Sequence, residues 1–375
     1  MINIFFPPKE LIKTSEKIDI IQVLRGIAVI MVIVFHFKDV IKPGEFLKKE
    51  LDFLFDSGAA GVDLFFVISG FIMVFVTKKS AGGIRSARNF LIKRILRIWP
   101  LYIISTVAYA IIVAPVIENI SLDIATKILK SIFFIPLSYL HPPYFGYAYL
   151  GVGWSLNYEM YFYVLIAISL LSGKYRWFVF PVLIISTLII IPLAFGNLTF
   201  RPLETPNYGS LCINLITNPI IWEFVYGAII GLLYITPATA RIFHGIFQSR
   251  TVMITVVVLV MWQYFSGFYG GHGPFYWGLS MAFLFMALVF YNRGRSIKYP
   301  TWLVYLGDIS FSVYVWHVPM AVFITHFFEA LSVPLLSTGT PAFFLTLCLT
   351  LIFSHVSYQL LEKKLHSFLA AKLKV

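Results

Sequence analysis

Apolar stretches of about twenty residues recur along the whole chain and constrain its fold more than any other feature. A helix of that length spans the hydrocarbon core of a bilayer, whereas a soluble protein covers its core with charged side chains. The chain of 375 residues is 59% hydrophobic and only 12% charged, so that charged coat is missing. The sequence therefore predicts an all-α integral membrane protein, with one transmembrane domain over residues 1–375 and no separate soluble domain.

We predict ten transmembrane helices, with both chain ends on the cytoplasmic side. This orientation places most of the 29 Lys and Arg residues on the cytoplasmic side, as the positive-inside rule requires. Residues 127–140 are too short for a comfortable crossing and precede a turn-rich segment, so we expect an interfacial or re-entrant helix there. The predicted spans are 20–37, 58–77, 98–114, 154–172, 177–195, 218–235, 251–268, 274–291, 303–328 and 341–361.

The formal net charge of +12 is the one feature that points toward nucleic acid. Basic residues that flank apolar spans explain this charge, so we expect a lipid bilayer and no nucleic acid as partner. The two cysteines, Cys212 and Cys348, form no recognisable disulfide or metal motif. We therefore expect no bound metal, and the sequence does not indicate an oligomeric state.

The first predicted span contains two ionisable side chains, Arg25 and His36. Such groups are costly inside a bilayer, so each is a functional candidate. Their spacing of eleven residues puts them on one helix face, roughly 16 Å apart along the axis. Structural alternatives stay open, because Arg25 could snorkel to the inner headgroups and His36 could hydrogen-bond to a neighbouring helix.

Arg94 and Arg97 lie three residues apart, just before the third predicted span. This spacing puts both guanidinium groups on one helical face, where they suit a phosphate-rich ligand at the inner membrane surface. The alternative is that the pair only sets topology or binds anionic lipid.

We single out three further ionisable residues within or at the edge of predicted spans. Glu159 lies near the outer end of the fourth span, at a depth similar to that of His36, so we predict that the carboxylate orients this imidazole. A structural hydrogen bond is the alternative for Glu159. His317 follows Tyr314 by one turn and could line the same cavity or bond across helices, whereas we interpret Asp63 as a structural carboxylate at a helix N-terminus.

Several separated motifs together are similar to one known family. They are IQVLRGIAVIMVIVFHF (21–37), GVDLFFVISGFIM (61–73), FLIKRILRIWPLY (90–102) and WSLNYEMYFY (154–163), with further matches at 306–319 and 358–365. In order and spacing the chain resembles the membrane acyltransferase family 3, the multispanning acyltransferases of bacterial surface polysaccharides. It departs from the family at Lys364, where a proline is common.

The resemblance implies transfer of an acyl group, usually acetyl, from a cytoplasmic acyl-CoA donor to a hydroxyl of a cell-surface glycan or lipid-linked sugar. It implies a multi-pass protein of the bacterial cytoplasmic (inner) membrane, with acetyl-CoA or another acyl-CoA as substrate and no permanently bound cofactor. At the positions that match the family motifs, the catalytic histidine corresponds to His36. The arginines expected to bind acyl-CoA are Arg25, Arg94 and Arg97.

We hypothesise that His36, oriented by Glu159, removes the proton from the acceptor hydroxyl in a direct ternary mechanism. An oxyanion stabiliser is also needed. The candidates for this role are Tyr314, Ser69 and Trp154. The candidates for the cavity or acceptor site are Asp63, Ser69, Trp154, Tyr314 and His317.

Two other function classes stay open from the sequence. One is a transporter or flippase of an anionic or glycolipid substrate that uses His36, Glu159 and His317 as a proton relay. The other is a non-catalytic membrane scaffold, which would leave the buried titratable groups without a purpose. The basic pair, together with Arg25 and His36 on one face, favours the CoA-dependent enzyme over both.

Overall fold

The computed structural model describes residues 18–114 and 121–373. Helices make up 77% of the structure, and no strand occurs within those two ranges. The first half of the chain forms α1 (Asp19–Phe37), α2 (Lys48–Phe55), α3 (Ala60–Thr77), α4 (Ile84–Val113), α5 (Leu122–Ile132), α6 (Trp154–Leu171), α7 (Arg176–Ile185) and α8 (Ile191–Ala194).

The second half forms a further series of helices. They are α9 (Leu211–Thr217), α10 (Trp222–Ile235), α11 (Pro237–Phe247), α12 (Arg250–Ser266), α13 (Trp277–Asn292), α14 (Thr301–Asp308), α15 (Ser310–Ala330), α16 (Pro334–Ser337), α17 (Thr340–Ser357) and α18 (His366–Leu373). A π-helical segment, Tyr358–Leu365, joins α17 to α18 without a break.

The prediction of an all-α protein with multiple membrane-spanning helices is confirmed. Among the described residues, seven helical segments are long and apolar enough to cross a bilayer, and α11 with α12 gives an eighth if this pair, bent by 80°, counts as one span. The other two predicted spans correspond to α6, whose first half carries polar residues, and to α13, which has only 16 residues. The count of ten and the orientation stay predictions.

The predicted span 303–328 is broken in the structure. Helix α14 ends at Asp308, and α15 begins at Ser310. Gly307 packs directly on α1, because an added Cβ there would lie 1.9 Å from the carbonyl oxygen of Gln22. The break lets α14 lie against α1 while α15 packs against α17.

The third predicted span also begins earlier than expected, because α4 starts at Ile84. Arg94 and Arg97 therefore lie inside this 30-residue helix, as their predicted position on one helical face requires. In the region of the predicted interfacial helix, α5 ends at Ile132, and the chain then runs without regular helix to residue 150. The location of α5 relative to the bilayer stays a prediction.

Glycines allow α3 and α10 to pack closely at the centre of the molecule. A Cβ added at Gly70 of α3 would lie 2.0 Å from the carbonyl oxygen of Phe224, and one added at Gly227 of α10 would lie 1.9 Å from that of Val67. Small residues of this kind let backbones approach where lipid supplies no hydrophobic driving force. We call this contact the α3–α10 glycine seam.

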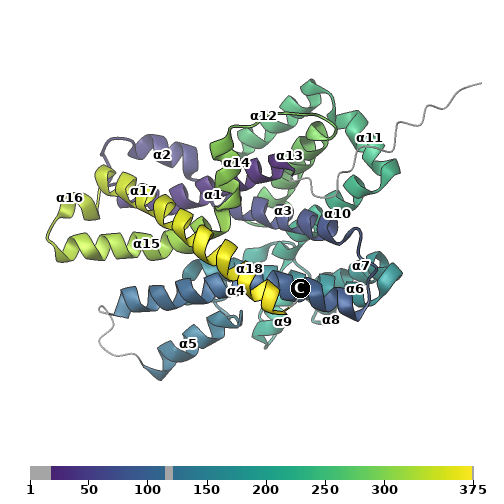
Figure 1. The fold of residues 1–375 in the computed structure, drawn as a ribbon, viewed down its shortest axis with the longest axis horizontal. Coiled ribbons are helices and arrows are strands. Elements are labelled where there is room, and N and C mark those ends of the chain that lie inside the picture. The colour runs from purple at the N-terminus through teal and green to yellow at the C-terminus, as the bar shows by residue number, and fades with distance from the viewer. Residues whose placement is uncertain (1–17, 115–120, 374–375) are drawn as a thin grey trace, which may run out of the picture.

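The packing of the helices defines a central region. Figure 1 shows α1 and α3 crossing the middle of the molecule, with α12 and α13 on one side and α4 and α6 on the other. Helix α4 packs against α6, α15 and the C-terminal α18, and α3 packs against α1, α10 and α13. As a result, α1, α3, α4, α6 and α15 surround one polar pocket.

Candidate active site

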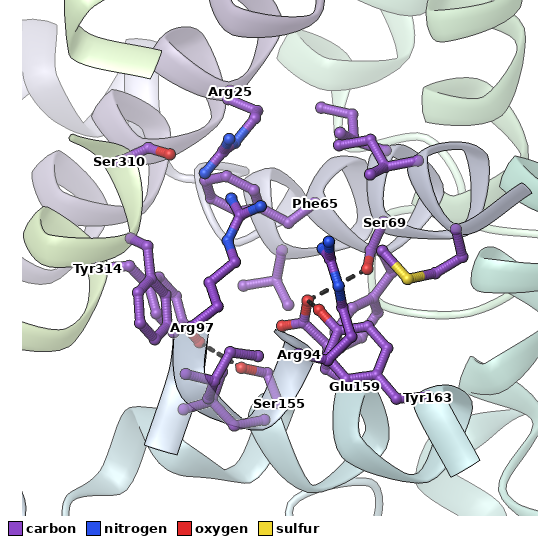
Figure 2. A pocket seen from close by; sticks show the side chains of 18 residues that line it. Arg25, Phe65, Ser69, Arg94, Arg97, Ser155, Glu159, Tyr163, Ser310 and Tyr314 are labelled. Carbon is purple, nitrogen blue, oxygen red and sulfur yellow. Dashed lines mark hydrogen bonds between the residues drawn. The ribbon is translucent and has the colours of Figure 1, made fainter. Parts of the chain in front are cut away.

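One pocket gathers most of the polar residues that the sequence singled out. Figure 2 shows these side chains around one space, and they come from α1, α3, α4, α6 and α15. The polar lining consists of Arg25, Ser69, Arg94, Arg97, Ser155, Glu159, Tyr163, Ser310 and Tyr314. The predicted donor-binding arginines therefore lie together, although they come from two helices that are far apart in the sequence. We call this space the arginine pocket.

Three guanidinium groups give the arginine pocket its charge. Arg25, which is 9% exposed, donates a 3.3 Å hydrogen bond to Gln22, and Nε of Arg94 has no hydrogen-bond partner. Among the described residues, no carboxylate lies within salt-bridge distance of Arg25, Arg94 or Arg97. Buried like charges at close range repel unless an opposite charge joins them, so the pocket suits an anionic ligand.

Two carboxylates lie near these guanidinium groups. Glu159 accepts hydrogen bonds from the Ser69 hydroxyl, at 3.1 Å, and from the Tyr163 hydroxyl, and it interacts electrostatically with Arg94. Glu362, from the π-helical segment after α17, accepts a hydrogen bond from Ser312 and interacts electrostatically with two of the arginines. Two negative charges against three positive ones leave the pocket with a net positive charge.

The predicted pairing of Glu159 with His36 is wrong. Glu159 is bonded to Ser69 and Tyr163 inside the arginine pocket, while His36 lies at the surface near the end of α1, with its ring centroid 4.9 Å from that of His317. Similar predicted depths did not imply contact, because the two side chains point toward different neighbours around the helix bundle.

Backbone carbonyls determine the tautomers of both histidines. Nδ1 of His36 lies 2.8 Å from the carbonyl oxygen of Val32, and Nδ1 of His317 lies 2.7 Å from that of Tyr314. A carbonyl oxygen can only accept, so Nδ1 carries the hydrogen in both neutral rings. Each Nε2 therefore keeps its lone pair and can act as a base.

Tyr314 connects the arginine pocket to this histidine pair. Its ring lines the pocket and lies 5.9 Å from His317, and its hydroxyl lies 2.6 Å from the Ser155 hydroxyl and 3.0 Å from the carbonyl oxygen of Val152. Arg25 and His36 are separated by roughly 16 Å of helical rise along α1. The site thus has a cationic end and an imidazole end.

Asp63 and Trp154 lie outside the arginine pocket, in a second buried cluster. Oδ2 of Asp63 is 2.8 Å from Nδ1 of His272, and the Gly273 amide donates a 2.8 Å hydrogen bond to Glu223. The Trp154 ring lies 5.6 Å from that of His272. Asp63 therefore has a specific partner beyond the helix N-terminus, and the cluster fixes the loop before α13 to α3 and α10.

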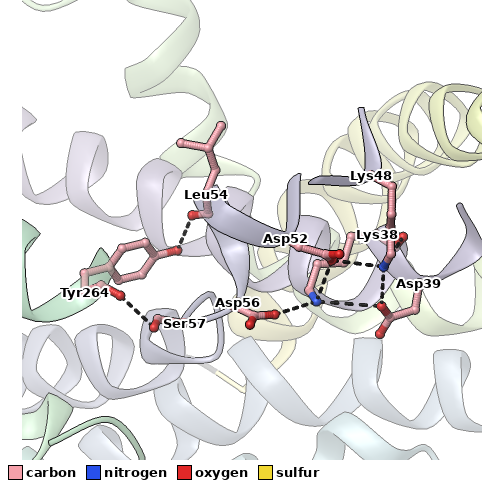
Figure 3. A network of polar contacts seen from close by, with 8 residues as sticks. All are labelled: Lys38, Asp39, Lys48, Asp52, Leu54, Asp56, Ser57 and Tyr264. Carbon is pink, nitrogen blue, oxygen red and sulfur yellow. Dashed lines mark hydrogen bonds and ion pairs between the residues drawn. The ribbon is translucent and has the colours of Figure 1, made fainter. Parts of the chain in front are cut away.

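A network of ion pairs holds the chain just after His36. Lys38, only 6% exposed, donates hydrogen bonds to Asp52, at 3.2 Å, and to Asp56, at 2.8 Å, and Lys48 lies 2.9 Å from Asp52 (Figure 3). The network ties the end of α1 to α2. It therefore restrains the segment that carries the imidazole.

Sequence reasoning missed several residues of these sites. Tyr163 follows Glu159 by one helical turn, a spacing that could have identified it, and Glu362 lies in the motif at 358–365. Glu223 did carry a signal, because it is an ionisable residue inside the predicted span 218–235. His272 gave none, because its contact with Asp63 depends on how a loop folds back onto the helices.

Comparison with known proteins identifies the family. The family model described as an acyltransferase domain matches residues 18–358, nearly the whole chain. The chain belongs to the membrane acyltransferase family 3. It is therefore an acyltransferase with multiple membrane-spanning helices.

Among similar proteins is the exopolysaccharide production protein ExoZ of Rhizobium meliloti, which is 30% identical over 70% of this chain and 76% of its own length. A Bacillus subtilis protein provisionally named the peptidoglycan O-acetyltransferase YrhL is 25% identical over 92% of this chain. Provisionally named O-acetyltransferases of Staphylococcus aureus are 22% identical over 90% of this chain. The chain spans only about half the length of these relatives, 54% of the Bacillus subtilis protein and 56% of the Staphylococcus aureus proteins. No solved structure matches the chain.

Proposed function

We propose that this acyltransferase transfers an acyl group, most simply acetyl, from acyl-CoA to a hydroxyl of a cell-surface polysaccharide or a lipid-linked saccharide. The proposed location is the bacterial cytoplasmic (inner) membrane, with the donor entering from the cytoplasmic side. The observation that carries the proposal is the net positive arginine pocket, one of whose lining side chains, Tyr314, packs against the pair formed by His317 and His36.

The arginine pocket suits the phosphates of CoA. Arg25, Arg94 and Arg97 present planar, permanently charged donors that grip phosphate oxygens in pairs. CoA carries its phosphates at one end and its thioester at the end of a long pantetheine arm. A donor held by the phosphates could extend this arm along α1, so that the thioester carbonyl lies near His36.

His36 supplies the base for the proposed transfer. Its Nε2 removes the proton from the acceptor hydroxyl while that oxygen attacks the thioester carbonyl. The carbon–sulfur bond breaks, and the protonated imidazole returns its proton to the leaving thiolate, which gives free CoA. Of the sequence-derived oxyanion candidates, Tyr314 lies nearest to the histidine pair.

A proton-relay transporter fits the arrangement less well. Such a relay would pass through His36, Glu159 and His317, but the hydrogen bonds of Glu159 lead to Ser69 and Tyr163. The saccharide acceptor is supported by the names of two relatives, which refer to exopolysaccharide production and to peptidoglycan O-acetylation.

A transfer assay tests the proposed role of His36. Purified protein in nanodiscs is incubated with radiolabelled acetyl-CoA and with polysaccharide. The polysaccharide comes from the bacterium that makes this protein and is first deacetylated with mild base. His36→Ala should lower label transfer at least about 100-fold, because the base is lost. His244→Ala is the matched control. Nδ1 of His244, which lies on α11 and not on α1, also faces a backbone carbonyl oxygen, that of Phe290 at 3.1 Å. Wild-type transfer by His36→Ala would remove this residue from the chemistry.

A further inference from the structure

His317 is the one member of the histidine pair that the proposed chemistry leaves unused. Its side chain is fully buried, with 0% exposure, and its Nε2 has no hydrogen-bond partner. A buried polar atom without a partner costs free energy, so it calls for an explanation in terms of function. Its ring contacts are with His36 at 4.9 Å, Tyr314 at 5.9 Å and Phe37 at 6.1 Å.

The tautomers explain why this atom has no partner in the resting pair. With both Nδ1 hydrogens directed to backbone carbonyls, Nε2 of His317 and Nε2 of His36 are both acceptors. Two acceptors cannot hydrogen-bond to each other. The pair gains a donor only when one ring takes up a proton.

We propose that His317 is a positioning residue that stabilises protonated His36 during acyl transfer. This inference rests on the proposed function. When Nε2 of His36 takes the acceptor proton, its single new N–H is shared between the reacting groups and the buried lone pair of His317 on the neighbouring ring, which stabilises the imidazolium. The proton then passes to the leaving thiolate, so both rings return to the neutral tautomers inferred from their backbone contacts.

The surroundings of the pair support a single shared proton. Asp39 is a carboxylate that acts electrostatically on His36, and it is itself paired with Lys48 at 3.0 Å and lies 3.7 Å from Lys38. Two adjacent imidazolium ions in this partly buried setting would repel each other. His317 therefore serves as the neutral acceptor of the pair.

Two substitutions separate this role from packing. His317→Leu fills a similar volume without an acceptor, and His317→Gln restores an amide oxygen near the lost nitrogen. We expect His317→Leu to lower kcat for transfer about 10-fold to 100-fold, the range for loss of a charge-assisted hydrogen bond. The KM for acetyl-CoA should change less than about twofold, and His317→Gln should recover part of kcat. The control is His244→Leu, which should retain wild-type kcat and KM.

The outcomes distinguish this inference from the proposed function. Wild-type kcat in His317→Leu, with transfer abolished in His36→Ala, overturns the inference and leaves the proposed function intact. Equal losses in His317→Leu and His317→Gln, or a parallel rise in KM, also overturn it, because they indicate a packing defect. Wild-type transfer by His36→Ala contradicts the proposed function itself.

A spectroscopic measurement checks the tautomers of both histidines and does not require the saccharide acceptor. Nitrogen-15 NMR of histidine-labelled protein, with the His36→Ala and His317→Leu variants used to assign signals, should show both rings protonated at Nδ1 in the resting protein. A resting His317 protonated at Nε2 would overturn the inference, since its lone pair would then be absent.

Discussion

Glu159 accepts hydrogen bonds from Ser69 and Tyr163 inside the arginine pocket, so its carboxylate stabilises nearby guanidinium groups and not His36. Substitution with glutamine keeps an oxygen that accepts both hydrogen bonds and removes only the charge. A residue that supports a donor site through hydrogen bonds should tolerate this change, whereas one that must stabilise an imidazolium by charge should not.

We therefore expect Glu159→Gln to retain transfer within about tenfold of wild type, a smaller loss than for His36→Ala. The assay is label transfer from acetyl-CoA to the deacetylated polysaccharide. A loss in Glu159→Gln as large as in His36→Ala, with acetyl-CoA binding intact, would return Glu159 to the catalytic role predicted from the sequence.

At the scale of the elements, the α3–α10 glycine seam positions Ser69 for the arginine pocket and Asp63 for the second cluster. A Cβ at Gly227 would meet a backbone oxygen at 1.9 Å, and backbone cannot rotate away as a side chain can. Gly227→Ala should therefore force the two helices apart and lower the free energy of unfolding by about 1–3 kcal/mol or more.

Thermal unfolding in nanodiscs, followed by tryptophan fluorescence, measures this effect. The matched control is Gly245→Ala on α11, where an added Cβ meets nothing within 4 Å. Equal melting temperatures for the two variants would contradict the close packing at the seam.

Hydropathy predicted most helices because each apolar stretch must satisfy its own backbone within the bilayer. The same logic failed at 303–328, because hydropathy averaged over the whole span hides the short polar stretch from Gly307 to Ser310 at which the helix breaks. It also placed the start of the third span too late, because the polar first turns of α4 continue as helix. Hydropathy reports the length of an apolar run, and tertiary packing determines where a helix bends or extends.

The candidate site was predictable where one helix carries it. Arg94 and Arg97 share a helical face by spacing alone, and they do line one pocket with Arg25. The partners of Glu159 and Asp63 were not predictable, because each depends on which helix or loop packs against the carboxylate.

At the scale of the whole molecule, the proposal requires the arginine pocket to open to the cytoplasm. With both chain ends inside, Lys79 lies on the cytoplasmic side and Lys42 on the opposite side, and both are exposed. Single cysteines are introduced at these positions in a protein from which Cys212 and Cys348 have been removed. Labelling of each cysteine with a membrane-impermeant maleimide shows on which side of the membrane it lies.

We expect Lys42→Cys to react in bacteria whose inner membrane is intact and Lys79→Cys to react only after that membrane is permeabilised. The cysteine-free protein serves as the background control. The reverse labelling pattern would place the arginine pocket on the wrong side for cytoplasmic acyl-CoA.

Acetyl-CoA binding tests the central claim, that the three arginines form the donor site, most directly. Radiolabelled acetyl-CoA should bind to wild-type protein and to His36→Ala in nanodiscs, and binding should fall at least about tenfold in the Arg94→Ala/Arg97→Ala double variant. Arg85→Ala/Arg88→Ala is the control, because this exposed pair has the same spacing on the same helix but lies outside the pocket. Wild-type affinity in the Arg94/Arg97 variant, or equal losses in both pairs, would contradict the account.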